Sequence, residues 1–267
     1  MSKVQTYGVT QRREAHSDLD LNVEELERIG FTSIQGVLSD RQCDELSLEL
    51  EKIYNLQIEE IGSEKLIENI GDKNNVRAPL LYSEQFKNLA LNPTLLEFAR
   101  RLLGQNFVLL MQNGVKTEPS KRQFQAQWHR DLNYQHWTSS KPLAINALFV
   151  LDEYSLENGC THVLPGSHLH AEFPSEAFTL KHEFPAILPR GSLLILNAMT
   201  YHRAGLNTGK NVRRAVNHVL GIPMLAQQID LSSLCAGSKH DVFEENYFGK
   251  TWSPASNAKT WRSKRIQ

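Results

Sequence analysis

The stretch QAQWHRDLNYQHW places a histidine, His129, and an aspartate, Asp131, on either side of a single arginine. If the stretch is a strand, both side chains point to the same face and can reach one common point. An imidazole nitrogen and a carboxylate oxygen suit non-haem Fe(II) when a third ligand joins them. On its own the pair is more typical of ordinary surface or core residues, so the metal hypothesis depends on the rest of the chain.

A second histidine stands late in the chain. His202, in LNAMTYHRAGLN, follows a strand-like apolar run at residues 192–197. Arg213 stands at the start of the next such run, and a guanidinium binds a carboxylate through two parallel hydrogen bonds. A chelating keto-acid cosubstrate requires such a partner. The order His, Asp, His, Arg, each at the edge of a predicted strand, therefore favours an iron site with an organic-acid cosubstrate.

The residues before Gly104 are predicted to be mainly helical. A short amphipathic helix is expected at residues 23–29, and residues 30–38 are expected to form a short strand. Ser39 followed by Gln42 is a capping-box pattern, which predicts the start of a longer helix. One face of that helix has the apolar spacing of a buried stripe, at Cys43, Leu46, Leu50 and Ile53.

Two further segments complete this part of the chain. The polar segment at residues 58–77 has weak periodicity and is expected to be a mobile lid or a surface loop. Asn92 and Pro93 are typical of the first positions of a helix, and Gly104 is typical of the position after its end. A helix is therefore predicted between them.

After Gly104 the chain changes to short apolar runs separated by breaks rich in Pro, Gly, Ser and Asn. Helices followed by many strands favour a mainly β fold with flanking helices, a β-sandwich or jelly roll. Too few helices alternate with the strands for a parallel, doubly wound sheet. The predicted strands are QFQAQWH, THVLPGSH and residues 107–111, 143–151, 192–197 and 214–222.

We expect a single domain over residues 1–267. Residues 1–105 would form the mostly helical flank with a possible lid, 106–225 the β core, and 226–267 a C-terminal extension. A chain of this length can bury a substantial core. The basic run at its end is expected to be a solvated tail.

Composition restricts the classes of function. The formal net charge of −1 argues against binding to nucleic acid or to an anionic membrane surface. The chain starts without the apolar region of a secretory signal, and no apolar run has the roughly 18 residues of a membrane span. Its three cysteines are far apart, which is typical of a reducing compartment. A cytoplasmic protein is therefore expected, with an unknown oligomeric state.

Three stretches carry a resemblance to a known family. They are WHRD (128–131), LDEYSLENGCTHVLPGSH (151–168) and RGSLLILNAMTYHRAGLNTGKNVRRA (190–215). Together with GF…VLSDRQCDEL near the N-terminus, they resemble the phytanoyl-CoA dioxygenase family of Fe(II)- and 2-oxoglutarate-dependent oxygenases, which includes ectoine hydroxylase. The resemblance spans most of residues 22–222. It implies a cupin-like core, the double-stranded β-helix or jelly roll.

The resemblance also implies a site. His129, Asp131 and His202 would hold the iron and form the catalytic centre. Arg213 would bind the distal carboxylate of the cosubstrate 2-oxoglutarate, while Arg214 would point to the opposite face of its strand. The implied reaction uses O2, releases succinate and CO2 and oxidises an unactivated C–H bond. Related halogenases have a small residue in place of Asp131, so hydroxylation, or a related desaturation or cyclisation, is expected here.

Five residues are candidates for the rest of the pocket. As we align the two chains, Gln112 matches a glutamine that lines the pocket of ectoine hydroxylase, which makes it a candidate for cosubstrate binding. Lys116 stands where that enzyme has an asparagine, so it is a candidate substrate contact of a different kind. Asn146 either touches the cosubstrate or is an ordinary sheet residue. Tyr134 and Trp137, just beyond the ligand pair, are expected to line the substrate pocket or to belong to the core.

The remaining charged and aromatic residues have structural interpretations. Within PGSH, His168 is expected to make a structural hydrogen bond, and His170 and His182 are expected in the loop that follows. His218 stands on a strand without an identified partner. Arg130 is expected to point away from the metal.

The substrate is expected to be a small metabolite or a natural-product intermediate, because nothing in the sequence identifies an acyl-CoA. Two other classes stay open. One is a metal-binding jelly roll without oxygenase activity, either a cupin-type isomerase or a ligand-sensing pseudoenzyme. The other is a hydroxylase that modifies a partner protein, which would need an open groove in place of a lidded pocket.

Overall fold

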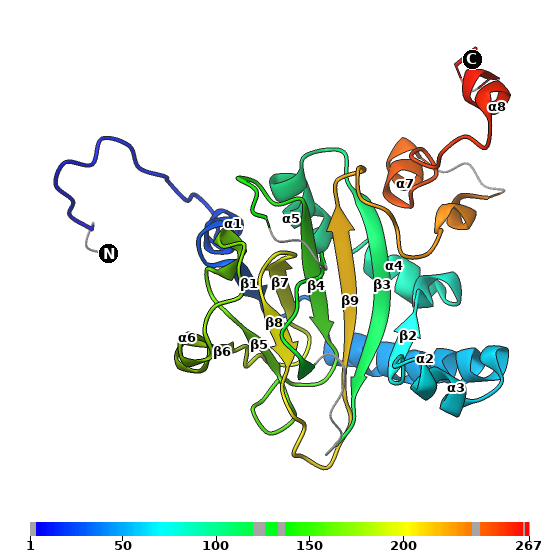
Figure 1. Ribbon diagram of the computed structural model, residues 1–267, viewed down its shortest axis with the longest axis horizontal. Helices are drawn as coiled ribbons and strands as arrows, with labels where there is room; N and C mark the ends of the chain where they lie inside the picture. The colour runs from blue at the N-terminus through cyan, green and yellow to red at the C-terminus, as the bar shows by residue number, and fades with distance from the viewer. Residues whose placement is uncertain (1–3, 120–125, 133–136, 237–240, 264, 267) are drawn as a thin grey trace.

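A computed structural model of the chain describes residues 4–119, 126–132, 137–236, 241–263 and 265–266 (Figure 1). Helices dominate the part before residue 105, and most strands follow it. The elements, in chain order, are α1 (Asp18–Ile29), β1 (Phe31–Ile34), α2 (Asp40–Ile61), α3 (Glu64–Asn69), β2 (Asn75–Arg77), η1 (Pro79–Leu81), α4 (Glu84–Ala90), α5 (Pro93–Leu103), β3 (Val108–Thr117), β4 (Ala144–Val150), β5 (Thr161–Val163), η3 (Ser167–Leu169), α6 (Glu176–His182), β6 (Phe184–Pro185), β7 (Leu193–Asn197), β8 (His202–Ala204), β9 (Arg213–Gly221), η4 (Ser232–Cys235), α7 (Val242–Tyr247) and α8 (Ala258–Ser263).

The strands form two sheets. The larger has the order β1-β7-β4-β9-β3-β2 and the smaller the order β6-β5-β8. All of these pairings are antiparallel. The smaller sheet lies in front of the β1-β7-β4 part of the larger one (Figure 1). This two-layer arrangement confirms the predicted β fold with flanking helices, the jelly roll.

The larger sheet is buried on both faces because it separates two apolar clusters. In β4, Ile145, Ala147 and Phe149 pack with the helices, whereas Leu148 and Val150 pack toward the smaller sheet. All seven residues of β4 are buried. A strand covered on both sides is expected to be apolar throughout, which explains the continuous run LAINALFVL. The inward face of β4 positions the site described below.

The helical predictions are largely confirmed. The side chain of Ser39 accepts a hydrogen bond from the Gln42 N–H, and Gln42 Oε1 accepts one from the Ser39 N–H at 2.9 Å. The Asn92 side chain caps α5, which begins at Pro93 and ends at Leu103. The first helix begins earlier than expected, at Asp18, because Ser17 caps it. The predicted apolar face of α2 is buried at Cys43, Leu46, Leu50 and Ile53.

The interpretation of residues 58–77 as a loop is wrong. The segment contains the last turn of α2, all of α3 and the strand β2, which pairs with β3. The Tyr54 hydroxyl donates to Glu64 at 3.0 Å and accepts from the Asn74 N–H at 3.3 Å. These contacts fix a polar segment whose periodicity is weak because only a few of its residues, such as Ile67, are buried. It therefore forms one edge of the larger sheet, beside β3.

The C-terminal extension also joins the helical side of the molecule. Tyr247 and Phe248 belong to the same apolar cluster as α2 and α5, and the Tyr247 hydroxyl donates to the Ala90 carbonyl at 2.7 Å. In the described part of the chain, no helix has the length and apolar character needed to cross a membrane.

Candidate metal centre and active site

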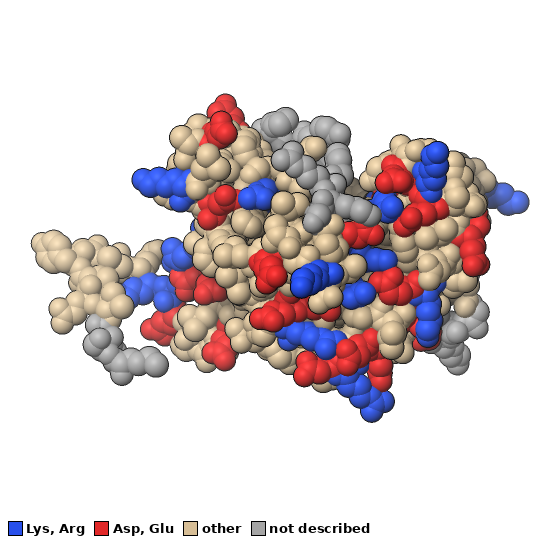
Figure 2. All heavy atoms as spheres, turned by 90° about the horizontal axis from the view of Figure 1, so that it is seen from below, with Lys and Arg blue, Asp and Glu red and all other residues tan. Residues whose placement is uncertain are grey.

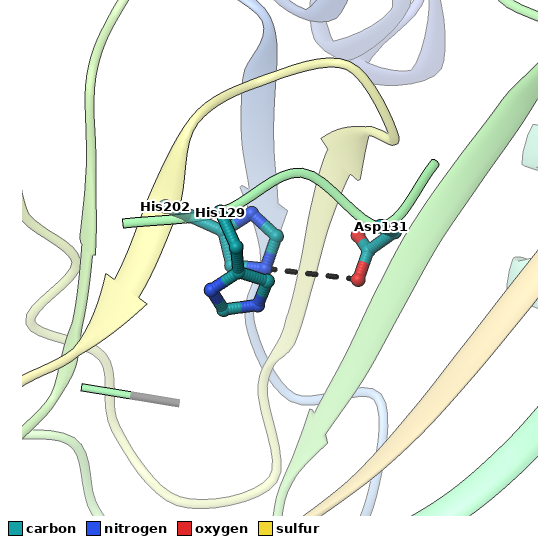
Figure 3. Close-up of side chains that lie close together, drawn as sticks. All are labelled: His129, Asp131 and His202. Carbon is teal, nitrogen blue, oxygen red and sulfur yellow. Dashed lines mark ion pairs between the residues drawn. The ribbon is translucent and has the colours of Figure 1, made fainter. Parts of the chain in front are cut away.

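The structure brings His129, Asp131 and His202 together. One ligand atom from each side chain lies within 4.8 Å of the other two. The two imidazole rings lie side by side, with centroids 4.4 Å apart, and the Asp131 carboxylate faces them (Figure 3). Asp131 Oδ1 is 3.8 Å from His202 Nε2, and both side chains are at least nine-tenths buried. Two nitrogens and one oxygen therefore converge on a single point.

Backbone hydrogen bonds hold the three residues in this arrangement. His202 begins β8, and its N–H and carbonyl exchange hydrogen bonds of 3.0 Å with His129. The Asp131 N–H donates to the Ala198 carbonyl at 3.1 Å, in the turn after β7. The predicted strand QFQAQWH is wrong in its described part, because His129 forms only an isolated bridge there. His129 and Asp131 converge through these local bonds, and strand alternation has no part in it.

Both histidines present the same nitrogen to the centre. Nδ1 of His129 lies 2.8 Å from the Gln127 carbonyl, and Nδ1 of His202 lies 3.0 Å from the Thr200 carbonyl. A carbonyl only accepts, so each Nδ1 carries the hydrogen and each Nε2 keeps a free lone pair. Burial, and then the neighbouring His202, lower the pKa of His129, which favours the neutral imidazole that a metal requires.

Arg130 lies between His129 and Asp131 in sequence and points away from them, as expected. It is 4% exposed, and its guanidinium donates to the carbonyls of Met199 at 2.7 Å, Ser167 at 2.9 Å and Ala171 at 3.1 Å. The guanidinium carbon also lies 3.9 Å from the centre of the Tyr201 ring. Arg130 therefore ties residues 129–131 to the loop after β5 and to the turn before His202.

Two glycines, Gly30 and Gly159, allow chain segments near the site to pack closely. Gly159 has a φ of +75°, and a Cβ there would lie 2.5 Å from the Gly205 carbonyl oxygen. Gly30 has a φ of +88°, and a Cβ there would lie 2.5 Å from both His168 and Thr200. Both positions require glycine because φ is positive and because a segment beside β8 lies too close for a Cβ: Thr200 at Gly30 and Gly205 at Gly159.

Asn146 lies on the inward face of β4 and contacts the site. Its side-chain Nδ2 donates to Asp131 Oδ2 at 2.7 Å, and the residue is 1% exposed. Its Oδ1 is buried and has no partner among the described residues. Asn146 is thus a sheet residue that also contacts Asp131, and its contact with the cosubstrate stays a prediction.

Arg213 is buried at the start of β9, 3% exposed. Its Nη2 donates to Thr117 Oγ1 at 2.6 Å, and its guanidinium lies 4.4 Å from the centre of the Tyr154 ring. Its Nε has no partner, and no carboxylate of the described residues pairs with it. A buried cation without an anion is unfavourable, so this position is suited to a negatively charged ligand.

Gln112 and Lys116 do not lie with the other candidates, because both face the helical side of the sheet. Gln112 donates to the Phe86 carbonyl at 2.8 Å and lies 2.7 Å from His218 Nε2. Lys116 pairs with Glu51 of α2 at 2.7 Å. The predictions that Gln112 lines the cosubstrate pocket and that Lys116 contacts substrate therefore disagree with the geometry. Both are occupied in fixing helices to the sheet.

The other candidates have varied positions. Tyr134 lies outside the described residues, and Trp137 is 39% exposed. His168 is buried, with Nε2 3.1 Å from the Glu27 carbonyl, in agreement with a structural role. His170 is exposed, and His182 ends α6.

Sequence reasoning missed the residues that support the site. Thr117 and Tyr154 contact Arg213, and the carbonyls of Gln127 and Thr200 set the histidine tautomers. The only signal in the sequence was Tyr154 itself, which follows the Leu-Asp pair of the family-like stretch. Backbone carbonyls leave no signal at all, because every residue has one.

The donor set fits a non-haem iron. Two neutral imidazoles and one carboxylate on one side of a metal leave the remaining coordination positions open, which is the arrangement that iron oxygenases use. The contacts of the imidazole Nδ1 atoms with backbone carbonyls are typical of metal-bound histidines.

Comparisons with known proteins agree with this geometry. The family model described as phytanoyl-CoA dioxygenase matches residues 26–215. An uncharacterized protein of Mycobacterium tuberculosis is 28% identical over 225 residues, which cover 81% of this chain and 80% of that protein. The iron/alpha-ketoglutarate-dependent dioxygenase penM of Penicillium thymicola is 29% identical over 104 residues, 36% of this chain and 33% of penM.

A solved structure has the same fold. It is the epimerase SnoN in complex with Fe3+, alpha ketoglutarate and nogalamycin RO, with a TM-score of 0.61 and 19% identity. The match covers 84% of this chain and 92% of SnoN. Because the family model covers most of the chain, this protein belongs to the phytanoyl-CoA dioxygenase family and is a 2-oxoglutarate-dependent non-haem iron dioxygenase.

Proposed function

We propose that this chain hydroxylates an unactivated C–H bond of a small metabolite or natural-product intermediate. His129, Asp131 and His202 hold Fe(II), and Arg213 binds the distal carboxylate of 2-oxoglutarate. The observation that carries the proposal is the convergence of one imidazole nitrogen from each histidine and one carboxylate oxygen within 4.8 Å of one another. When bound, iron and 2-oxoglutarate would activate O2: one oxygen atom oxidises 2-oxoglutarate to succinate and CO2, and the other is available for the C–H bond of the substrate.

The chain itself positions the reactants and excludes water. The Nε2 lone pairs of His129 and His202 are directed by hydrogen bonds on the opposite side of each ring. Thr117 and Tyr154 hold the Arg213 guanidinium, which leaves Nε as a donor for a carboxylate. A charge-assisted hydrogen bond of this kind orients the cosubstrate as well as binding it.

The apolar side chains beside Asp131 support a largely apolar substrate, and the charges on one face of the molecule give no support to a polyanionic one. Leu132 directly follows the proposed ligand Asp131. Together with Met111 and Leu225, it packs against a buried apolar cluster that includes residues of β3, β4 and β9. These three side chains are only partly buried. The face seen in Figure 2 has basic and acidic side chains interspersed, so it offers no field of one sign to a polyanion such as an acyl-CoA.

Relatives support the same substrate class. The solved SnoN complex contains nogalamycin RO, and another solved relative is described as the carbocyclase SnoK from nogalamycin biosynthesis. Epimerisation and cyclisation begin, like hydroxylation, with the oxidation of a C–H bond. Analysis of the product therefore decides between these outcomes.

Arg213 favours the proposal over a jelly roll without oxygenase activity, but it does not separate the two kinds of hydroxylase. A cupin-type isomerase or a ligand-sensing jelly roll has no need of a buried arginine for a dicarboxylate. A protein-modifying hydroxylase needs an open groove near the metal. A lid at residues 58–77 would have argued against such a groove. That segment packs beside β3, so it no longer separates a small-molecule hydroxylase from a protein-modifying one.

Anaerobic addition of Fe(II) and 2-oxoglutarate tests the proposal. The wild type should give the weak visible charge-transfer band of the chelate, and absence of that band would contradict the assignment. Asp131→Ala and His202→Ala should give no band. His170→Ala is a matched control, since His170 is exposed, and it should give the wild-type band. Succinate release with a panel of apolar candidates then identifies substrate.

A further inference from the structure

A hydrogen bond joins Asn146 to Asp131 and occupies only one of the two carboxylate oxygens. Oδ2 accepts from Asn146 Nδ2 at 2.7 Å, while Oδ1 lies 3.8 Å from His202 Nε2, on the side of the two imidazoles. A carboxylate can bind a metal through one oxygen or through both. In this arrangement only Oδ1 is directed to the histidines.

The orientation of the Asn146 amide follows from its neighbour. An ionised carboxylate only accepts hydrogen bonds, so the amide must present its NH2 group to Asp131 and keep its oxygen away. The remaining Oδ1 is buried without a partner among the described residues. Among the described residues, the side-chain amide of Asn146 therefore hydrogen-bonds to Asp131 alone.

The two partners differ in how firmly the backbone holds them. Asn146 lies in the middle of β4, where the strand pairs with Leu196 of β7 on one side and Val219 of β9 on the other. Asp131 lies on an irregular segment, and its own N–H makes a single backbone bond, to Ala198. The rigid sheet can therefore fix the carboxylate through the amide, as outer partners of metal ligands do.

We propose that Asn146 is a positioning residue that restricts Asp131 to binding the metal through Oδ1 alone. The inference rests on the proposed function, because it requires Asp131 to be a ligand. Its consequence is an open coordination position: a carboxylate that binds through both oxygens occupies one more site on the metal. Asn146 thereby keeps that site available for the cosubstrate or for O2.

The test replaces the amide by groups that cannot donate. Asn146→Leu keeps the approximate volume, and Asn146→Ala is a second variant without a donor in case the first folds poorly. Both should bind Fe(II) about 10- to 100-fold more weakly than the wild type in anaerobic titrations. In crystals loaded with Fe(II), Asp131 should approach the metal with one oxygen in the wild type and with both in the variants. The near-infrared circular dichroism of the Fe(II) proteins should show a matching change in coordination number.

Asn113→Leu is the matched control. Asn113 is a buried asparagine of β3 whose side chain contacts Gln228 and none of the three proposed metal ligands. The control variant should retain the wild-type Fe(II) affinity and spectrum. If the wild type binds Fe(II) and the Asn146 variants keep both its affinity and its one-oxygen coordination, this inference is wrong while the proposed function stands. If the wild type binds no Fe(II), both are wrong.

Discussion

Arg213 and Arg214 are neighbours in β9, and their side chains lie on opposite faces of the larger sheet. Arg213 contacts Thr117 and Tyr154 on the inward face. Arg214 donates to Glu51 of α2 at 2.9 Å and to Asp152 at 3.2 Å on the other side. Asp152 also accepts the Arg214 N–H at 2.8 Å, which fixes the strand at this point. The structure ties Arg214 to the fold, and the proposed function assigns the ligand to Arg213.

Arg213→Ala should raise the KM for 2-oxoglutarate about 10- to 100-fold, because the variant loses hydrogen bonds to a charged carboxylate. The affinity for Fe(II) should change little, because Arg213 contacts none of the three proposed ligands. Steady-state kinetics and anaerobic metal titration measure the two quantities. Arg214→Ala is the control: it should lower the free energy of unfolding and leave the KM near the wild-type value. Equal effects of both variants on KM would contradict the assignment.

Metal binding should stabilise the fold, since a ligand that binds only the folded state adds to the free energy of unfolding. At a concentration 100 times the Kd, the gain is about 2.7 kcal/mol, or roughly 5–10 °C in Tm for a chain of this size. Thermal melts with and without Mn(II), after treatment with a chelator, measure it. The shift should vanish in Asp131→Ala and persist in Glu183→Gln. In the wild type the Glu183 carboxylate pairs with Arg203 and His162 and with none of the three proposed metal ligands. A shift in Asp131→Ala equal to that of the wild type would exclude Asp131 as a ligand.

Much of this fold could be predicted because local signals and tertiary packing agree. Ser39 and Asn92 cap helices whose apolar faces are also buried, and the strand runs at 143–151 and 192–197 lie where two clusters enclose them. The opposite orientations of Arg213 and Arg214 followed from the period of a strand alone.

The remaining features depend on contacts between distant segments. Gln112 was placed in the pocket by alignment, but its partners Phe86 and His218 come from α4 and β9, and no spacing near Gln112 indicates them. His129 and Asp131 converge through backbone bonds to His202 and Ala198, which a strand pattern cannot reveal. For the same reason the pairing of Asn146 with Asp131 could not be read from the sequence.

Arg130→Met should destabilise the protein by about 2–4 kcal/mol, because it leaves buried carbonyls at Ser167, Ala171 and Met199 without their donor. It should also weaken Fe(II) binding, since the residue lies between two proposed ligands. Urea unfolding and metal titration measure these effects. Arg28→Met is the control, an exposed arginine paired with Glu24, and should change the stability by less than about 0.5 kcal/mol. Wild-type stability of Arg130→Met would show that water replaces the guanidinium at no cost.

His218 should make the protein sensitive to mild acid. Burial lowers the pKa of His218 to about 3, and the ring accepts a hydrogen bond from Gln112, which only the neutral form can do. The unfolded chain binds a proton at this residue near pH 6.5 and the folded chain does not, so stability falls as the pH drops from about 6.5 toward 3. Burial also lowers the pKa of His168 and His162, which acts in the same direction.

His218→Gln keeps an acceptor for Gln112 and removes the titrating group. Between pH 7.5 and 5.0 the wild type should lose about 2 kcal/mol more of its free energy of unfolding than the variant loses, at 1.36 kcal/mol per pH unit below 6.5. Urea unfolding at the two pH values, with Fe(II) and 2-oxoglutarate absent, measures the difference. Equal losses in the two proteins would mean that His218 takes up a proton as readily in the folded state as in the unfolded chain.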